Sequence, residues 1–244
     1  MSEVNAVATA RLRVILWDID GTLLRTRRQG SFRDYTRPVL ARMFGTAGRL
    51  DELTVSGMTD LQIVSEALRD EGFTSEQIRE RAPELAALYH EELERLTGRE
   101  ELYYALPGAR SALETLDRSP RYLNSLLTGN VEPAARLKLR LVGLASFFRL
   151  PGAFGEDSHD RRDLPALASE RIARHLRLDL KPSQLIVIGD TPNDIACAKH
   201  HGARSVAVAT GRAYSVEDLR AHNPDAVLPD LSDTELFMRT LAAL

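Results

Sequence analysis

The sequence predicts an α/β protein, a doubly wound parallel sheet of the Rossmann-like kind with an inserted, small, all-helical cap. Three observations predict this fold. Short apolar runs bounded by turn residues are typical of buried parallel strands. Stretches with helical spacing of apolar residues lie between these runs. One long segment near the N-terminus has helical spacing and contains no convincing strand.

The expected strands and core helices alternate along the chain, as a doubly wound sheet requires. Four main strands are expected at residues 14–17, 122–127, 185–188 and 205–209, and an edge strand at 226–228. Helical spacing appears at residues 109–116, 135–142 and 167–176. With 244 residues, of which 43% are hydrophobic, the chain can bury a sizeable core.

The break in this alternation sets the expected domain boundaries. Residues 1–23 and 103–244 are predicted to form the catalytic core, and residues 24–102 the helical cap. Pro107 and Gly108 then return the chain to the core.

Within the cap, three helix starts carry recognisable signals. Thr59 is expected to cap a helix that runs to Gly72, and residues 74–77 have the form of a capping box. Pro83 begins a further helix that ends near Gly98.

Composition excludes several classes of function. The chain has 32 Lys and Arg against 35 Asp and Glu, so its charge of -3 provides no global basic field for nucleic acid or an anionic membrane. No stretch approaches the roughly 18 apolar residues that span a bilayer, and the segment from Met1 to Arg13 has no signal-sequence core, so we expect a cytoplasmic protein. Cys197 is the only cysteine, which excludes an internal disulfide and a cysteine zinc cluster, and we expect it to be buried.

Two aspartates directly follow the first expected strand. Asp18 and Asp20 are two residues apart, so in an extended chain both carboxylates project to the same side. Carboxylates held that close predict either a raised pKa or a bound metal. The alternative is a solvated turn after a strand.

Two other strand ends also carry polar groups. Thr128, Gly129 and Asn130 could donate hydrogen bonds to a phosphate, although Thr128 and Asn130 could instead cap a helix. Asp190 and Asp194 follow the third main strand and would add carboxylates, or simply cap a loop. Because ligands collect at the carboxyl ends of parallel strands, a shared site is favoured, and oxygen ligands in this number suit Mg²⁺.

In this order, the segments from Asp18 to Thr22 and from Gly189 to Asp194 resemble the haloacid dehalogenase superfamily over nearly the whole chain. The resemblance implies that Asp18 is a nucleophile that becomes an aspartyl-phosphate, and that Asp20 is the general acid and base. It also implies that Mg²⁺ binds Asp18, the backbone carbonyl of Asp20, and Asp190, with Asp194 as a ligand or a support.

Residues 57–60 are similar to a segment of phosphoglycolate-phosphatase-like caps. The resemblance therefore implies Mg²⁺-dependent hydrolysis of a small phosphorylated metabolite, such as phosphoglycolate or a sugar phosphate. A phosphomutase of the β-phosphoglucomutase type would use the same two aspartates. A dehalogenase would need neither an acid at Asp20 nor a metal, and a non-catalytic phosphate-binding module would not need all four aspartates.

The chain departs from the family pattern at the cation beside the nucleophile. The family takes a lysine from the start of the helix before the last motif, but Lys138 and Lys181 are the only lysines between Asn130 and Asp190, and neither lies there. Arg161 is the candidate replacement, because a guanidinium stays charged and can grip phosphate oxygens bidentately. The alternatives are that Arg161 is solvated, or that Arg162 has this role.

Five further arginines crowd the expected junction of core and cap: Arg25, Arg27, Arg28, Arg33 and Arg37. A charge cluster of this kind is usually a solvated surface. The functional alternative is attraction of an anionic substrate toward the cleft.

Overall fold

The computed structural model describes residues 12–28, 31–98 and 101–244. The segment from Met1 to Arg13, for which the sequence predicts no signal peptide, lies largely outside the described residues. No helix in the described ranges is long and apolar enough to cross a membrane.

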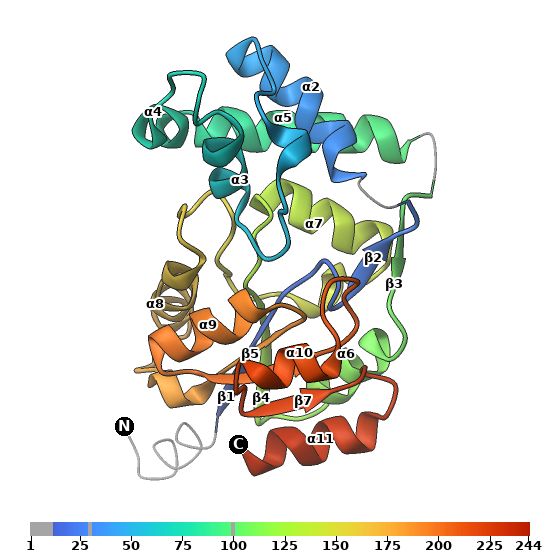
Figure 1. Cartoon of the computed structure of the whole chain (residues 1–244). Helices are drawn as coiled ribbons and strands as arrows, with labels where there is room; N and C mark the ends of the chain where they lie inside the picture. Colours follow the sequence, from blue (N-terminus) through green and yellow to red (C-terminus); the bar gives the residue numbers. More distant parts are fainter. Residues whose placement is uncertain (1–11, 29–30, 99–100) are drawn as a thin grey trace.

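The core is a parallel sheet in the order β4-β1-β5-β6-β7 (Figure 1). Its strands are β1 (Arg13–Trp17), β4 (Tyr122–Leu126), β5 (Leu185–Gly189), β6 (Arg204–Val208) and β7 (Ala226–Leu228). Every neighbouring pair is parallel, so the predicted α/β class and all five expected strands are confirmed. β1 lies between β4 and β5, so its carboxyl end is beside theirs.

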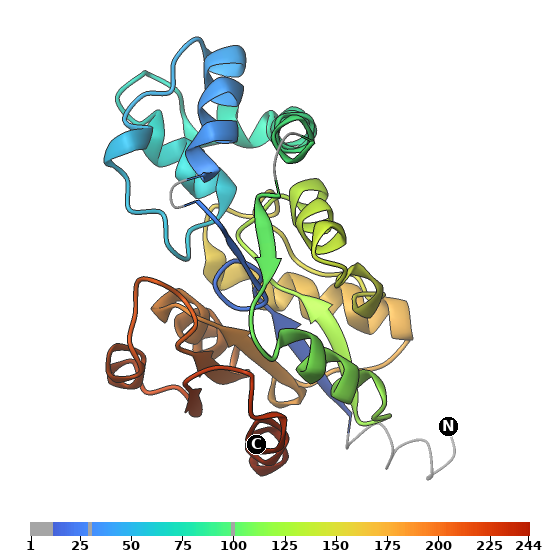
Figure 2. The same ribbon diagram turned by 90° about the vertical axis from the view of Figure 1, so that its right-hand side faces the viewer.

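Helices cover both faces of the sheet (Figure 2). They are α6 (Ala109–Asp117), α7 (Glu132–Leu141), α8 (Leu164–Leu176), α9 (Pro192–His201), α10 (Val216–Ala221) and α11 (Thr234–Ala243). Alternate residues of β1 serve the two layers: Ile15 and Trp17 pack in the same cluster as residues of α6 and α11. Val14 and Leu16 pack with residues of α8 and α9. The two-residue period of a strand therefore produces two apolar layers around one sheet.

A helical unit lies above the carboxyl ends of the strands (Figure 1). It contains α2 (Phe32–Phe44), the short η1 (Leu50–Glu52), α3 (Asp60–Ala67), α4 (Ser75–Glu80) and α5 (Ala82–Thr97). Thr59 caps α3, Thr74 and Gln77 form the expected capping box, and α5 ends at Gly98. Residues 24–102 are therefore proposed to form the cap.

Two details of the cap differ from expectation. α3 ends at Ala67 rather than near Gly72, because residues 69–71 are exposed and form a hydrogen-bonded turn instead of presenting another apolar face. The cap segment also begins with a strand: β2 (Leu24–Thr26) pairs antiparallel with β3 (Tyr103–Ala105). A strand of three residues is too short to show the alternation of apolar and polar residues that identifies strands in a sequence. This two-stranded sheet is therefore visible only from the pairing of β2 with β3.

Candidate active site

The turn after β1 depends on a glycine that lies against the third motif. Gly21 has φ +90°, and a Cβ there would lie 2.4 Å from Asp190 Oδ2. The hydroxyl of Thr22 donates to Asp190 Oδ1 at 3.2 Å. The backbone N–H of Asp18 donates to the Ile188 carbonyl at 2.9 Å, which fixes the start of this turn against β5. A left-handed conformation and a close approach therefore both require glycine at position 21.

Three carboxylates meet at this turn. Oxygens of Asp18, Asp190 and Asp194 lie within 4.8 Å of one another, and all three side chains are buried. Burial and the neighbouring carboxylates raise the pKa of Asp18 to about 7, although Arg161 opposes the shift. Burial and the charges of Asp18 and Asp194 likewise raise the pKa of Asp190 well above its usual range. The alternative of a solvated turn at Asp18 is therefore wrong.

Arg161 is the cation beside this cluster. Its Nη2 donates to Asp18 Oδ1 at 2.9 Å and to Asp194 Oδ1 at 2.6 Å, and only 6% of its side chain is exposed. Burial would lower the pKa of Arg161, but Asp194 and Asp18 raise it, so the guanidinium stays charged. Arg162 is exposed and pairs with Asp160. The solvated alternative thus describes Arg162 and not Arg161.

The donor set fits a divalent cation. Three buried carboxylates and one guanidinium leave two negative charges when all of these groups are ionised. Oxygen ligands at this charge and spacing suit Mg²⁺. Asp194 also accepts from the Thr191 backbone N–H and hydroxyl through Oδ2, so it caps α9 as well as contacting Arg161.

Asp20 contacts different partners from Asp18. Its Oδ2 accepts from Asn130 Nδ2 at 2.7 Å and from Lys138 Nζ at 2.8 Å. Asn130 also donates to the Thr128 hydroxyl and accepts from Lys138. The Asp20 side chain lies outside the three-carboxylate cluster. Asp20 could therefore contact a metal there only through its backbone carbonyl, as the resemblance implies. Asp20, Thr128, Asn130 and Lys138 form one hydrogen-bonded group.

Lys138 is a charged site residue that the sequence did not place beside Asp20. It lies inside α7 with 3% of its side chain exposed. Burial would lower its pKa, but Asp20, Tyr35 and Tyr103 together raise the pKa of Lys138 well above its ordinary value. The available signal was its spacing, because Lys138 follows Ala134 and Ala135 by four and three residues and so shares their buried face.

The cap reaches directly into the loop after β4. The Asp60 N–H donates to the Gly129 carbonyl at 2.7 Å, and Asp60 Oδ2 accepts from the Val131 N–H at 2.8 Å. Val131 is the N-cap residue of α7 and has no capping side chain of its own. The alternative that Thr128 or Asn130 caps a helix is therefore wrong. The side chain that accepts from the N-terminus of α7 is that of Asp60, which belongs to the helical cap.

A cavity of about 240 Å³ lies between core and cap. The core supplies Asp18, Asp20, Thr128, Gly129, Asn130, Lys138 and Arg161 to its wall. Ser31, Tyr35, Asp60 and Tyr103 also line it and were not foreseen, because no spacing rule connects them to the strand ends. Six of the eight expected site residues line the cavity, and Asp190 and Asp194 meet Asp18 directly behind it.

Comparison with known proteins decides the family. Residues 15–199 match the haloacid dehalogenase-like hydrolase family. The chain belongs to this family. The match runs from within β1 to within α9 and so includes every segment that forms the site.

Relatives within the family carry phosphatase names. The chain is 26% identical to the pyrophosphatase PpaX of Bacillus velezensis over 91% of this chain and 94% of that protein. It is 24% identical to a phosphoglycolate phosphatase of Vibrio vulnificus over 91% and 93%. A β-phosphoglucomutase structure from Clostridium difficile shares the fold, with a TM-score of 0.64 and 17% identity over 95% of this chain and 98% of that one. The expectation of a phosphatase of this superfamily is confirmed.

Proposed function

We propose that this haloacid dehalogenase-like hydrolase cleaves a small phosphomonoester in a Mg²⁺-dependent reaction through an aspartyl-phosphate on Asp18. The proposal depends on one observation, which is that the two oxygens of the Asp18 carboxylate have different surroundings. Arg161 holds Asp18 Oδ1, whereas Oδ2 has no hydrogen-bond partner in the described part of the chain. A buried carboxylate with one oxygen fixed and one free, at the wall of a cavity, is suited to in-line attack on phosphorus.

In the first step, Asp18 Oδ2 bonds to phosphorus while the bond from phosphorus to the leaving oxygen breaks. Asp20 gives its proton to that oxygen, so the alcohol leaves uncharged. Asn130 and Lys138 occupy Asp20 Oδ2, which leaves Oδ1 to carry the proton. Arg161 offsets the negative charge that Asp18 and the phosphoryl oxygens bring together.

In the second step, water attacks the phosphorus of the aspartyl-phosphate. The Asp20 carboxylate takes a proton from that water, the bond between phosphorus and Asp18 breaks, and inorganic phosphate leaves. Both steps use the same two carboxylates, held by two different cations.

Asp18, Asp190, Asp194 and the backbone carbonyl of Asp20 are the groups proposed to hold Mg²⁺. When bound, this cation neutralises phosphoryl oxygens as charge develops on them. Thr128, Gly129 and Asn130 are proposed to contact the phosphoryl group, since all three line the cavity beside Asp18.

The cavity restricts the leaving group to a small polar molecule. Lys138 and the buried Ser31 hydroxyl line it, and that hydroxyl has no hydrogen-bond partner in the described part of the chain. A short phosphorylated hydroxy acid, such as phosphoglycolate, or a small sugar phosphate offers oxygens to both groups. The phosphoglycolate phosphatase among the relatives supports the same substrate class.

A phosphomutase would use the same aspartates with a sugar phosphate in place of water, and the likeness to β-phosphoglucomutase concerns the fold alone. A screen of phosphorylated metabolites with Mg²⁺ separates these activities. Release of inorganic phosphate without a bisphosphate activator supports the phosphatase. Isomerisation that requires such an activator supports the mutase. If the screen detects neither activity, a non-catalytic phosphate-binding module is the remaining alternative.

The decisive variant is Asp18→Asn, which should remove turnover while leaving the fold intact. Its matched control is Asp179→Asn, because Asp179 is exposed and lies outside the cavity. Beryllium fluoride should form a phosphoryl-like adduct on Asp18, detectable by fluorine NMR. An adduct on another residue, or turnover retained in Asp18→Asn, contradicts the assignment.

A further inference from the structure

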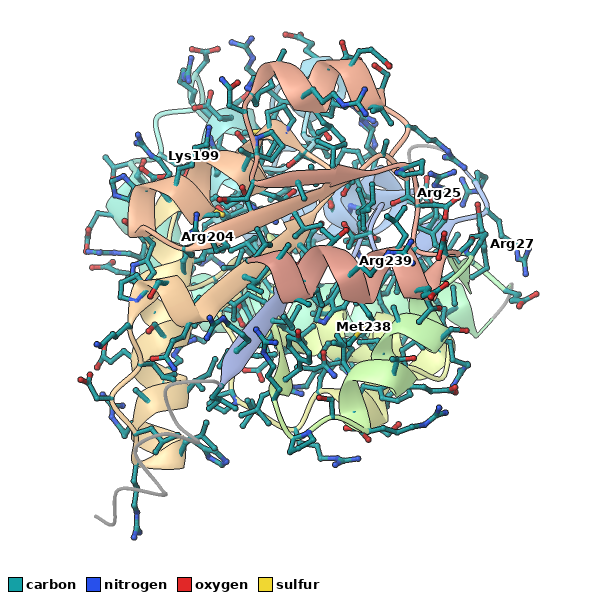
Figure 3. The ribbon with its side chains drawn as sticks, turned by 90° about the horizontal axis from the view of Figure 1, so that it is seen from below. Arg25, Arg27, Lys199, Arg204, Met238 and Arg239 are labelled. Atoms are coloured by element: carbon teal, nitrogen blue, oxygen red, sulfur yellow. The ribbon has the colours of Figure 1, made fainter. Side chains whose placement is uncertain are left out.

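The arginine cluster divides into paired and unpaired members. Arg27 pairs with Glu101, Arg28 with Asp34, and both Arg33 and Arg37 with Asp51. Arg25 on β2 is the exception, because it has no acidic partner within the described residues. Its Nε is buried and has no hydrogen-bond partner in the part of the chain that the structure describes. Figure 3 labels Arg25 and Arg27 on the same side of the molecule, away from Lys199 and Arg204. A half-buried guanidinium that has no ion pair among the residues described can bind an anionic ligand.

Arg25 lines a second cavity of about 210 Å³ that adjoins the reaction cavity. Asp20, Thr26 and Ser56 belong to the walls of both cavities. A molecule bound at Asp18 can therefore extend past Asp20 toward Arg25.

Arg212 contributes a second guanidinium to this wall. It donates to the Thr26 carbonyl at 3.2 Å and has no acidic partner among the residues that the structure describes. The adjacent Thr210 hydroxyl donates to the Gly21 carbonyl at 2.6 Å, which ties this loop to the turn after β1. The two guanidinium groups thus come from strand β2 and from the loop after β6, and both segments are hydrogen-bonded to the turn after β1.

The two carboxylates in the same wall, Asp20 and Asp190, have other partners than these arginines. Asp20 is paired with Lys138, and Asp190 belongs to the three-carboxylate cluster. Among the described residues, Arg25 and Arg212 form no ion pair with these carboxylates, so both guanidinium groups can still pair with a bound anion. Guanidinium groups with free N–H donors bind phosphate oxygens in parallel pairs.

We infer that Arg25 and Arg212 form a second phosphate subsite, which holds the second phosphoryl group of a substrate whose first phosphoryl group lies at Asp18. This inference rests on the proposed function. It extends the proposed substrates from simple phosphomonoesters to compact bisphosphates and diphosphates, in which two phosphoryl groups lie within the span of the two joined cavities.

The test is calorimetric titration of the full chain, with Mg²⁺ present, by methylenebisphosphonate and by methylphosphonate. The bisphosphonate should bind at least about tenfold more tightly than the monophosphonate. Arg25→Gln and Arg212→Gln should each weaken bisphosphonate binding by about five- to tenfold and leave methylphosphonate binding unchanged. Chelation of Mg²⁺ by the bisphosphonate is the same for every variant, so it does not affect this comparison.

Arg27→Gln is the matched control, because it lies near Arg25 but is paired with Glu101. It should bind both compounds like the parent. Arg212 is exposed, so its replacement tests the subsite even where a change at the half-buried Arg25 disturbs folding. Equal binding of both phosphonates, no bisphosphonate binding at millimolar concentration, or equal losses for both compounds in Arg212→Gln would each overturn the inference.

A kinetic comparison separates this inference from the proposed function. Hydrolysis of p-nitrophenyl phosphate, which has one phosphoryl group, should change by no more than about twofold in Arg212→Gln. The KM for pyrophosphate should rise in the same variant. If the parent releases phosphate from neither compound and from no phosphorylated metabolite in the screen, the proposed function fails, whereas the titration still decides whether the subsite exists.

Discussion

Lys138 Nζ lies 2.8 Å from Asp20 Oδ2 and 2.5 Å from Asn130 Oδ1, on the buried face of α7. This contact means that the proposed general acid is held by a cation that belongs to a neighbouring helix and not to the loop of Asp20 itself. Asp20 keeps 39% of its side chain exposed, so the ion pair fixes one oxygen while the other stays accessible.

Replacing Lys138 should therefore impair the steps that need Asp20. We expect Lys138→Met to lose about 10- to 100-fold in kcat, more for substrates with poor leaving groups than for p-nitrophenyl phosphate. A double-mutant cycle with Asp20→Asn should be strongly non-additive, because both changes remove the same pair. Lys181→Met, at an exposed position outside the cavity, should behave like the parent. Additive losses would contradict the coupling of Lys138 to Asp20.

Arg161 should matter far more than its neighbour. Its contact with Asp18 offsets charge as phosphate arrives, so Arg161→Ala should lose about 10²–10³ in kcat/KM, equivalent to about 2–4 kcal/mol. Arg162→Ala is the matched control, because Arg162 is exposed and pairs with Asp160. Arg161→Lys should recover part of the loss if charge dominates, and little if the guanidinium geometry dominates. Near-parental kinetics in Arg161→Ala would remove the residue from its proposed role.

Divalent metal should stabilise the folded chain as well as support turnover. At Mg²⁺ concentrations about 100 times its dissociation constant, the free energy of unfolding should rise by about 2.7 kcal/mol. Chelation should abolish turnover and restored Mg²⁺ should recover it. In Asp190→Asn the stabilisation should largely vanish, because the cluster loses one of its three carboxylates. Full activity in metal-stripped protein would exclude the proposed role of Asp190.

The buried carboxyl of Asp60 should give stability a defined pH dependence. Burial raises the pKa of Asp60 to about 6, despite the opposing hydrogen bond from Val131. Between about pH 4 and pH 6 the folded chain therefore keeps a proton that the unfolded chain has lost, so this group makes the free energy of unfolding fall as pH rises.

Asp60→Asn removes this titration but keeps an oxygen that can accept from Val131. Its free energy of unfolding relative to the parent should increase from near zero at about pH 4 to roughly 1–3 kcal/mol above pH 6. Urea unfolding between these values measures the difference. A difference that does not change with pH, or a variant that is less stable at pH 8, would contradict the assignment to Asp60.

The sequence alone determined the parallel sheet, the expected strands, most helix starts in the cap, and the strand ends that carry Asp18, Thr128 and Asp190. Apolar periodicity and capping chemistry are local, and parallel strands must end at one edge of the sheet. Those facts bring the polar groups together without any knowledge of side-chain contacts. Arg161 was identified as the candidate cation through the resemblance to the haloacid dehalogenase superfamily, in which a lysine has this role, and spacing alone could not exclude Arg162.

Only the tertiary structure decided which cation contacts which carboxylate. Arg161 meets Asp18 while Lys138 meets Asp20, although the two lysines in this region looked equally remote from the site along the chain. Asp60, from the cap, accepts from the N–H of Val131, the N-cap residue of α7, and Arg25 is the member of its arginine cluster that has no ion pair within the described ranges. These outcomes depend on long-range packing, because an ion pair forms only where the fold places two charges within about 4 Å and removes water from around them. No local period in the sequence encodes that distance.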